Sequence, residues 1–316
     1  MRIEVAPAPV LPGPNAFAAI SSGHQWRGKR LHGERLRVFF EAGYGDAFQC
    51  ARFLSPFVAW ADGPVTLVTC PQLGGIFTRS FPDLDVRTAH PLPPARWVVG
   101  AWRTGDDPSW FTICAETLRL GPARPPYLAA TPRRFARDIL HVGLCVRAHA
   151  DAQGGFDPPR SIADPAILAP WWDVPGIQWH TLLPPGHAPP HPTVVDHGAE
   201  LADWTDTADL IAGLDLVISV DTAVAHLAGA LGVPLWMLLR PACPVGGRTE
   251  ELLTDVRYGD PRWEPLHCPR GGLVEPGAGC LYPTARLFHQ SKPGDWASLV
   301  AAVAAALAAI PLRGIS

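Results

Sequence analysis

The segment with the clearest chemical potential is DLVISVDTAVAHLAGALGVPLWMLL, residues 215–239. Its pattern predicts a buried strand, a helix that begins directly after it, and a second strand. Asp221 stands at the helix start, where its carboxylate can cap the helix, and the backbone N–H groups of Thr222, Ala223 and Val224 point out of the helix N-terminus. Ligands of open α/β sheets bind at the carboxyl ends of strands, so this turn is a candidate phosphate or diphosphate site. An Asp-Thr pair at such a turn also fits a purely structural cap.

A second strand–turn–helix unit lies near the start of the chain. LRVFF (36–40) has the composition of a buried strand, the turn EAGYGD follows with Gly43, Gly45 and Asp46, and a helical pattern runs over 47–60. A carboxylate at this position is either an ordinary helix cap or a group available for acid–base chemistry. Residue types alone do not choose between the two.

The chain has few cations that could bind an anionic ligand. It carries 26 Lys and Arg against 29 Asp and Glu, a net charge of −3, which gives no electrostatic reason to expect nucleic acid as a partner. Only Lys29 and Lys292 are lysines. An anion site in this protein therefore depends on arginine, backbone N–H groups or a helix N-terminus.

Short apolar strands alternate with helices in two successive halves of the chain. This alternation predicts the α/β class, with two parallel sheets that helices cover on both faces. A proline-rich stretch, GPARPPYLAATPRR (121–134), separates the halves and is the candidate linker between domains 1–130 and 131–316. The first half is expected to have strands at 36–40, 65–70, 84–87 and 97–100 and helices at 47–60, 72–80 and 108–119. The second is expected to have strands at 139–146, 177–183, 216–220 and 235–239 and helices at 165–172, 207–213, 222–231 and 294–310.

Length and composition indicate a soluble, cytoplasmic protein of 316 residues, enough for about two domains. The start of the chain lacks the basic and apolar pattern of a signal peptide, and the longest apolar run, 297–310, is shorter than the roughly 20 residues that cross a bilayer. The last helix has one apolar stripe and is expected to pack against the protein, with the N-terminal domain as one candidate surface. Seven scattered cysteines without a C-x-x-C pair indicate neither a disulfide scaffold nor a zinc ribbon.

Several runs of sequence resemble one known family. DTAVAHLAGALGVP (221–234), with DTADLIAGLDLVIS before it and YPTARLFHQSKPGDW (282–296) after it, is similar to the C-terminal glycosyltransferase domain that follows tetratricopeptide repeats in bacterial proteins. That domain is related to glycosyltransferase family 9, the heptosyltransferases. Trp26-Arg27-Gly28 and EAGYGDAFQCARF (41–53) resemble the family's lead-in and glycine-turn segments. The resemblance covers about residues 26–310 and implies a GT-B fold, two Rossmann-like domains that face each other across a cleft. No such repeats precede it, so we expect a free-standing catalytic module.

The resemblance implies roles for the glycine turn and for the 221–226 loop. It implies that Asp46 is the general base, which deprotonates an acceptor hydroxyl while that hydroxyl attacks the anomeric carbon. It implies that the backbone of DTAVAH binds the diphosphate of the donor and that Asp221 reaches the sugar. His226, one helical turn beyond Asp221, contacts the diphosphate, orients the loop or is a half-buried packing histidine.

The chain also matches an Arg-Ser pair of the family and departs from the family around it. Arg160 and Ser161 stand at that pair, and Arg160 is a candidate cation for the diphosphate leaving group. Arg147 and His149 stand where the family has small or amide residues. The segment 240–281, before the YPT motif, is much longer than in the family and is expected to form a loop over the cleft that shapes acceptor choice.

Two groups of residues have metal-binding side chains without metal-binding spacing. His187 and His191 lie in PPGHAPPHP, where proline prevents the helix that would put both on one face. The pair is expected in a solvated loop, and His180 and His197 are the other two histidines within the same eighteen residues. The segment 240–281 holds Cys243, Cys268, Cys280 and His267, which match no ligand pattern. Candidates for stacking on a sugar are the tryptophans in loop-like contexts, Trp102, Trp110 and Trp263.

Together with the resemblance, the sequence predicts a metal-independent glycosyltransferase without a cofactor. It would move a hexose or heptose from a nucleotide-diphosphate sugar to an acceptor hydroxyl, with inversion. The acceptor stays open among glycan, lipid, protein and small molecule; nucleic acid and a membrane span are not expected. Two alternatives stay open as well. One is a transferase-like protein that binds a nucleotide sugar or a partner without turnover, which the altered 145–149 segment favours. The other is a nucleotide-sugar epimerase of the same build.

Overall fold

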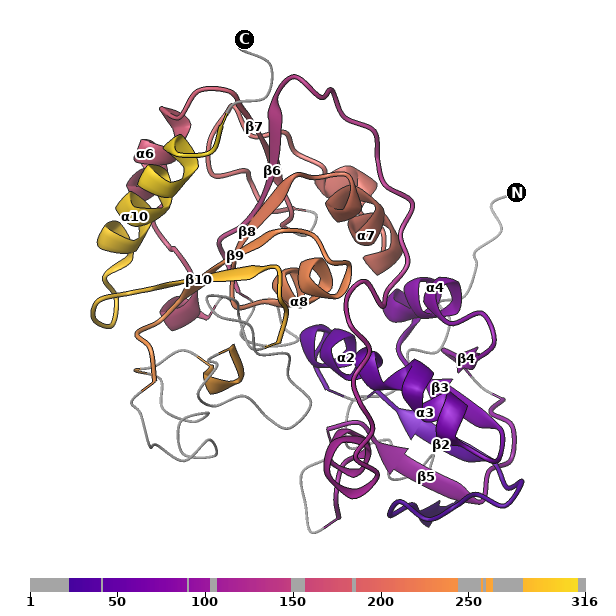
Figure 1. The fold of residues 1–316 in the computed structure, drawn as a ribbon. Coiled ribbons are helices and arrows are strands. Elements are labelled where there is room, and N and C mark those ends of the chain that lie inside the picture. The colour runs from indigo at the N-terminus through magenta and orange to yellow at the C-terminus, as the bar shows by residue number, and fades with distance from the viewer. Residues whose placement is uncertain are drawn as a thin grey trace, which may run out of the picture. The chain divides into compact units, whose positions relative to one another are not determined.

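The computed structural model describes residues 23–40, 42–89, 91–102, 107–148, 157–183, 186–243, 257, 260–263 and 281–311. The chain divides into two compact units, the first made of residues 1–130 with 203–205 and the second of residues 131–202 with 206–316. Each unit is built on one five-stranded sheet with helices (Figure 1). The α/β class predicted from the sequence is confirmed.

The first unit is built on a sheet with the strand order β1-β5-β2-β3-β4, in which every pairing is parallel. Every residue of β2 and β3 is buried, as expected for strands that are covered on both faces. The strands are β1 (His24–Gln25), β2 (Leu36–Phe39), β3 (Val65–Val68), β4 (Asp85–Arg87) and β5 (Trp97–Gly100). The helical segments are α2 (Tyr44–Cys50), η1 (Ala51–Phe53), α3 (Leu54–Trp60), α4 (Pro71–Ser80), α5 (Trp110–Thr112) and η2 (Ile113–Thr117).

Aromatic side chains fill the core of the first unit. Trp26 and Trp110 have no exposed surface, and both pack edge-on against Phe57, with ring centroids 5.4 and 5.6 Å apart. Edge-to-face pairs of this kind add to the free energy gained by burying the rings. The lead-in tryptophan, α3 and α5 therefore share one core.

The second unit has the strand order β10-β9-β8-β6-β7, again with only parallel pairings. Its central strand, β8, is buried at all five positions. The strands are β6 (Leu140–Cys145), β7 (Ile177–Thr181), β8 (Leu216–Val220), β9 (Leu235–Leu239) and β10 (Ala285–His289). The helical segments are η3 (Pro158–Arg160), η4 (Pro165–Leu168), α6 (Ala169–Trp172), η5 (Gly198–Glu200), α7 (Trp204–Ala212), α8 (Ala223–Ala230), η6 (Pro261–Trp263) and α10 (Trp296–Ala308).

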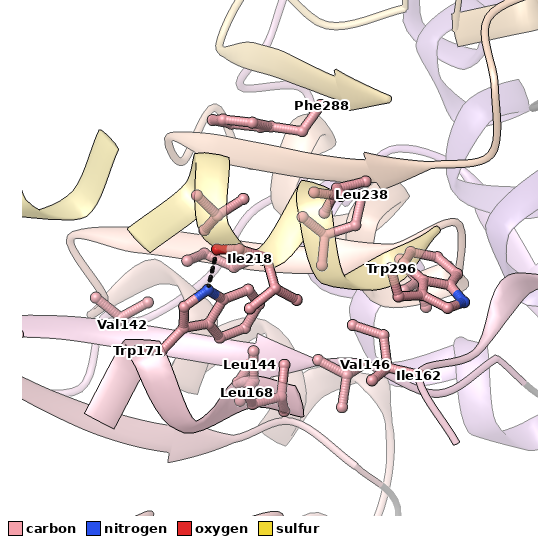
Figure 2. Close-up of a cluster of buried hydrophobic side chains, with 14 of the residues drawn as sticks. Val142, Leu144, Val146, Ile162, Leu168, Trp171, Ile218, Leu238, Phe288 and Trp296 are labelled. Atoms are coloured by element: carbon pink, nitrogen blue, oxygen red, sulfur yellow. Dashed lines mark hydrogen bonds between the residues drawn. The ribbon is translucent and has the colours of Figure 1, made fainter. Parts of the chain in front are cut away.

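The last helix, α10, packs into the core of the second unit (Figure 2). Its apolar stripe, which includes Leu299, Val300 and Val303, is buried there with Trp171 of α6. The Trp171 indole Nε1–H donates to the Val300 carbonyl oxygen at 2.9 Å, and the Trp171 ring stacks on Trp179 of β7 at a centroid distance of 6.0 Å. The bond satisfies the only polar atom of a side chain that has no exposed surface.

Both sheets contain a switch point, a place where successive strands are added to opposite sides of one strand. In the first unit β3 follows β2 on one side, while β5 is added on the other side of β2. In the second unit β7 follows β6 on one side and β8 is added on the other. The crevice outside the carboxyl ends of the two strands at a switch point is where open α/β sheets bind ligands. The fold thus offers two such places, one beside β2 and β5 and one beside β6 and β8.

Three predicted helices differ from those in the structure. The predicted helix 47–60 is divided into α2, η1 and α3; Pro56 has no N–H to bond the Arg52 carbonyl, which accounts for the irregular turn at 51–53. The predicted helix 108–119 is the short α5 followed by the π-helical turn η2. The predicted helix 165–172 begins as the 3₁₀ turn η4.

The sequence analysis missed two strands, and both lie at sheet edges. β1 has only two residues, and β10 alternates between buried and more exposed positions instead of forming a continuous apolar run. Both sit at the end of a strand order, where one side has no neighbouring strand. In the described part of the chain, no helix has both the length and the apolar character needed to cross a bilayer.

Candidate active site

The 221–226 loop lies at the switch point of the second unit. β8 ends at Val220, and the chain passes through Asp221 and Thr222 directly into α8. The neighbouring strand β6 ends at Cys145, which pairs in register with Ser219 near the end of β8. The loop therefore starts where the carboxyl ends of β6 and β8 meet, the position at which an α/β sheet binds ligands.

Among the described residues, no side chain caps the N-terminus of α8. Thr222 is the N-cap residue, and its backbone has the extended conformation at φ −146° and ψ 170°. The first hydrogen bond into the helix runs from the Ala225 N–H to the Thr222 carbonyl oxygen, so the N–H groups of Ala223 and Val224 precede it. The expectation that Asp221 caps the helix is wrong, because the Asp221 Oδ1 accepts a hydrogen bond from the Trp263 Nε1–H at 3.0 Å instead.

His226 is buried beside the loop. Only 5% of it is exposed, and its Nδ1 lies 3.1 Å from the Tyr282 hydroxyl. Its Nε2 lies 4.0 Å from the Asp221 Oδ1, and its ring lies 4.8 Å from the ring of Trp263. Both ring nitrogens thus face protein groups, which favours the orienting role among the three that the sequence left open.

Arg160 approaches the same loop from the segment that follows β6. Its Nε donates to the Asp157 Oδ2 at 2.5 Å, and its Nη1 donates to the Asp221 backbone carbonyl at 3.3 Å. The side chain keeps 30% of its surface exposed. A guanidinium that is partly exposed and fixed beside a helix N-terminus can add its charge to that of the helix dipole.

Ser161 has a structural role beside Arg160. It is buried, and its hydroxyl accepts from the Ala148 N–H at 2.9 Å and donates to the Ala148 carbonyl at 3.3 Å. The Ile162 N–H donates to the Val146 carbonyl at 2.9 Å. These bonds close the loop between 146 and 162 and fix the backbone from which Arg160 extends.

Burial and a second carboxylate control the charge of Asp221. Burial raises the pKa of Asp221 and so does the nearby Asp260, whereas Arg160, Arg262 and the Trp263 hydrogen bond act in the opposite direction. Burial also acts to raise the pKa of Asp260, but its ion pair with Arg262, with Nη2 2.5 Å from Oδ2, outweighs burial and lowers that pKa. The loop is therefore held in a compact group of buried opposite charges.

Asp46 lies at the switch point of the first unit. α2 follows β2 after a short turn, its N-cap residue is Gly43, and Asp46 is in its first turn. Neither Gly43 nor Gly45 has a positive φ, so the turn does not need glycine for its backbone conformation. A Cβ at Gly43 would lie 3.3 Å from the Asp46 Oδ2, so a side chain at this position would crowd the carboxylate.

Trp102 is placed beside Asp46 by the end of β5. Its Nε1–H donates to the Asp46 backbone carbonyl at 3.2 Å, and its ring stacks on Phe111 at 4.7 Å. Trp102 is half-buried, whereas Trp110 and Trp263, the other two candidates for sugar stacking, have no exposed surface. Of the three, only Trp102 has a ring that a ligand can reach.

The predicted site residues fall into two groups, one in each unit. Gly43, Gly45 and Asp46 belong to the first unit. The second unit holds the residues predicted to bind the donor, which are Arg160, Ser161, Asp221, Thr222, Ala223, Val224 and His226. His149 and most of the segment 240–281, Cys268, Cys280 and His267 included, lie outside the described residues.

The sequence analysis missed two residues of the second group. Tyr282 was recognised only as part of the YPT motif, and Trp263 only as one of several tryptophans in loops. The signal for Tyr282 was its place in the family-like run 282–296. No sequence pattern indicated that Trp263 bonds to Asp221, 42 positions earlier in the chain.

Three histidines form a buried row elsewhere in the second unit. The His141 Nδ1 lies 2.9 Å from the His180 Nε2, and the His180 Nδ1 lies 2.9 Å from the His197 Nε2. The His141 Nε2 faces the Ala136 carbonyl, which can only accept, so His141 carries its proton on Nε2. The His141 Nδ1 then accepts from the His180 Nε2–H, and the His180 Nδ1 accepts from the His197 Nε2–H. The row ends with the His197 Nδ1 at 3.5 Å from the Glu200 Oε2.

His180, which lies in the predicted strand at 177–183, and His197 are buried, with only 2% and 7% of their surface exposed. Burial, with the charges of His197 and His141 as smaller causes, lowers the pKa of His180 to about 4. Within the described ranges, no group of three or more His, Cys, Asp and Glu residues has an arrangement that could hold a metal ion. The cysteines described are free thiols, and burial raises the pKa of Cys114 and Cys145, which makes them unreactive.

Comparison with known proteins identifies the fold. Residues 202–246, which include the whole 221–226 loop, match the sequence model of glycosyltransferase family 9 (heptosyltransferase). The crystal structure of the family 9 glycosyl transferase from Veillonella parvula has a TM-score of 0.53 with 12% identity, and the match covers 83% of this chain and 88% of that one. The Escherichia coli ADP-heptose LPS heptosyltransferase II has a TM-score of 0.50 with 12% identity, covering 86% of this chain and 99% of that one.

A curated relative matches by sequence over most of the chain. Protein FlbA of Caulobacter vibrioides is 26% identical over 317 residues, which cover 90% of this chain and 48% of FlbA. The chain thus spans about half the length of that relative. The two parallel five-stranded sheets with their helices are the GT-B fold of the heptosyltransferases, as the sequence predicted, and residues 202–246 have the pattern of glycosyltransferase family 9.

Proposed function

We propose that this chain is a glycosyltransferase of the family 9 type, which transfers a sugar from a nucleotide-diphosphate sugar to an acceptor hydroxyl. The observation that carries the proposal is the position of the DTAVAH loop. It opens an uncapped helix at the switch point of a GT-B-like sheet, and the segment that contains it matches the family 9 pattern. Uncapped N–H groups at a helix N-terminus bind phosphate groups well.

The donor would bind in the second unit. The N–H groups at the start of α8 would bind the diphosphate, with Arg160 as the cation, and the Asp221 side would face the sugar. The leaving diphosphate gains negative charge in the transition state. N–H groups that already point at it before the reaction therefore lower the activation barrier. A relative is named for its ADP-heptose donor, which makes ADP-heptose and similar ADP-sugars the first donors to test.

The acceptor would be activated in the first unit. Asp46 lies at the switch point of that sheet, in the first turn of α2, and the residue is half-buried. As general base it would take the proton of the acceptor hydroxyl as the oxygen attacks the anomeric carbon, and the product would have the inverted configuration. Trp102, whose half-buried ring lies beside Asp46, would offer a surface for the acceptor or sugar.

In this proposal arginine and the helix dipole neutralise the leaving group, so we expect turnover without an added metal ion. Activity that survives extensive chelation would agree with this expectation. Activity that is lost on chelation and restored by one divalent metal would contradict it.

Product analysis tests the proposal. The protein is incubated with ADP-heptose, with or without a panel of sugar, lipid-linked and peptide acceptors, and the products are identified by mass spectrometry. The proposal expects a glycosylated acceptor and free ADP, and Asp46→Asn is expected to stop transfer while ADP affinity stays within about twofold of wild type. Conversion of the donor without acceptor would indicate an epimerase, and tight donor binding without any product would indicate a binding protein.

A further inference from the structure

Trp263 bonds to a carboxylate that lies one residue before the N-cap of α8. A helix N-terminus attracts a nearby carboxylate, because the helix dipole and the free N–H groups there favour negative charge. Here the Asp221 Oδ1 instead accepts from the Trp263 Nε1–H at 3.0 Å. The indole nitrogen can only donate, so the direction of this bond is fixed.

Two ring contacts hold Trp263 in place. Its ring lies 4.8 Å from that of His226 and 5.7 Å from that of Tyr282, and none of its surface is exposed. Tyr282 is itself fixed by its hydroxyl at the His226 Nδ1 and by its close contact with Gly229, where a Cβ would lie 2.3 Å from the Tyr282 Cγ. The indole N–H is therefore presented to Asp221 by a packed aromatic cluster.

The turn that contains Trp263 is also locked by its own hydrogen bonds. The Trp263 N–H donates to the Asp260 carbonyl at 3.1 Å. The Asp260 carboxylate accepts from the Arg262 backbone N–H at 2.8 Å and from the Arg262 guanidinium. The second carboxylate near Asp221 is thereby neutralised in place and does not compete for the indole.

We propose that Trp263 is a positioning residue that keeps the Asp221 carboxylate away from the N-terminus of α8, so that the N–H groups of Ala223 and Val224 stay open to a diphosphate. This inference rests on the proposed function and deepens it. A carboxylate on those N–H groups would occupy the place of the diphosphate and repel its charge. The long segment between β9 and β10 thus contributes directly to the donor site through one tryptophan.

The test removes the indole N–H and keeps the ring. Trp263→Phe frees the Asp221 carboxylate to cap α8, and we expect it to weaken ADP binding about tenfold, the factor that corresponds to a typical N-cap interaction. The double variant Trp263→Phe with Asp221→Asn has no carboxylate to occupy the site and is expected to recover most of the lost ADP affinity. Loss of packing alone would not be reversed by that second change.

A matched control loses the same kind of bond elsewhere. Trp171→Phe also removes a buried indole N–H, the one that donates to the Val300 carbonyl at 2.9 Å (Figure 2). It should lower stability and leave the ADP dissociation constant at the wild-type value. An equal loss of ADP affinity in Trp171→Phe and Trp263→Phe would overturn the inference.

A second measurement needs no ligand and separates this inference from the proposed function. Amide hydrogen exchange at Ala223 and Val224 should slow in Trp263→Phe, because a cap protects these N–H groups, and should return toward wild type in the double variant. Unchanged exchange together with unchanged ADP affinity in Trp263→Phe would overturn the inference. The proposed function would still stand if the wild type binds ADP. A wild type that binds no nucleotide would overturn the proposed function, and the exchange data would still decide where the Asp221 carboxylate lies.

Discussion

Acidification is expected to destabilise the second unit through His180. The side chain is 2% exposed and lies between the His141 and His197 rings, with its Nδ1 accepting from the His197 Nε2–H. A proton on the His180 Nδ1 would set two N–H groups against each other at 2.9 Å in a buried site. Burial is the largest cause that lowers the pKa of His180 to about 4, and the charges of His197 and His141 lower it further.

The size and sign of the effect follow from the two protonation states. An unfolded chain has an ordinary histidine pKa of about 6.5, so between pH 6.5 and 4 the unfolded chain binds a proton at His180 that the folded protein does not. The stability from the neutral row is fully present above pH 6.5 and is lost as the pH falls toward 4. A pKa shift from about 6.5 to about 4 corresponds to about 3 kcal/mol in the free energy of unfolding.

Hydrogen exchange measures this effect within the second unit. The free energy of opening is obtained from the amides of β6 and β7 at several pH values between 4 and 7.5, after correction for intrinsic exchange rates. His180→Gln removes the titrating group, and His191→Gln, a change at a partly exposed histidine of the same unit, is the control. On acidification, the free energy of opening should fall by about 3 kcal/mol more in wild type and His191→Gln than in His180→Gln. The same pH dependence in wild type and His180→Gln would refute the reasoning.

Three further substitutions test particular contacts. Arg160→Ala is expected to weaken ADP binding about tenfold in calorimetry and Arg160→Lys by less, because a guanidinium beside the diphosphate makes charge-assisted hydrogen bonds. An unchanged ADP dissociation constant in Arg160→Ala would remove Arg160 from the donor site. Gly229→Ala places a Cβ 2.3 Å from the Tyr282 Cγ and should lower the free energy of unfolding in urea by about 1–3 kcal/mol. Gly121→Ala, whose Cβ would meet nothing within 4 Å, should lower it far less. Leu299→Ala in the α10 stripe should cost about 2–5 kcal/mol in the same assay, and a cost below 1 kcal/mol would show that α10 is loosely packed.

The α/β architecture could be predicted because its strands are continuous apolar runs. The bounds predicted for the strands at 216–220 and 235–239 are those of β8 and β9. Strands that are buried on both faces need such runs, and the helices between them need one apolar stripe, so local pattern and fold agree. The edge strand β10 lacks this signal, because three of its five positions are not fully buried.

The position of the site could also be predicted, but not its contacts. Asp221 follows a buried strand and precedes a helix, which suffices to place it at the carboxyl edge of a sheet. Its partner Trp263 lies 42 positions away in a segment without periodic pattern, so nothing local indicates the bond that replaces the helix cap. The same reason applies to His180, whose neighbours His141 and His197 come from other elements.

Titration with ADP tests the central claim, a diphosphate site at the start of α8, most directly. Ala223→Pro removes one N–H at the first position of α8, where proline is tolerated, and the extended backbone of Thr222 suits a residue before proline. We expect calorimetry to detect binding of ADP but not of adenosine to the wild type, and Ala223→Pro to bind ADP about tenfold more weakly with little change in melting temperature. A wild type that binds no nucleoside diphosphate, or a folded Ala223→Pro variant with undiminished affinity, would contradict the claim.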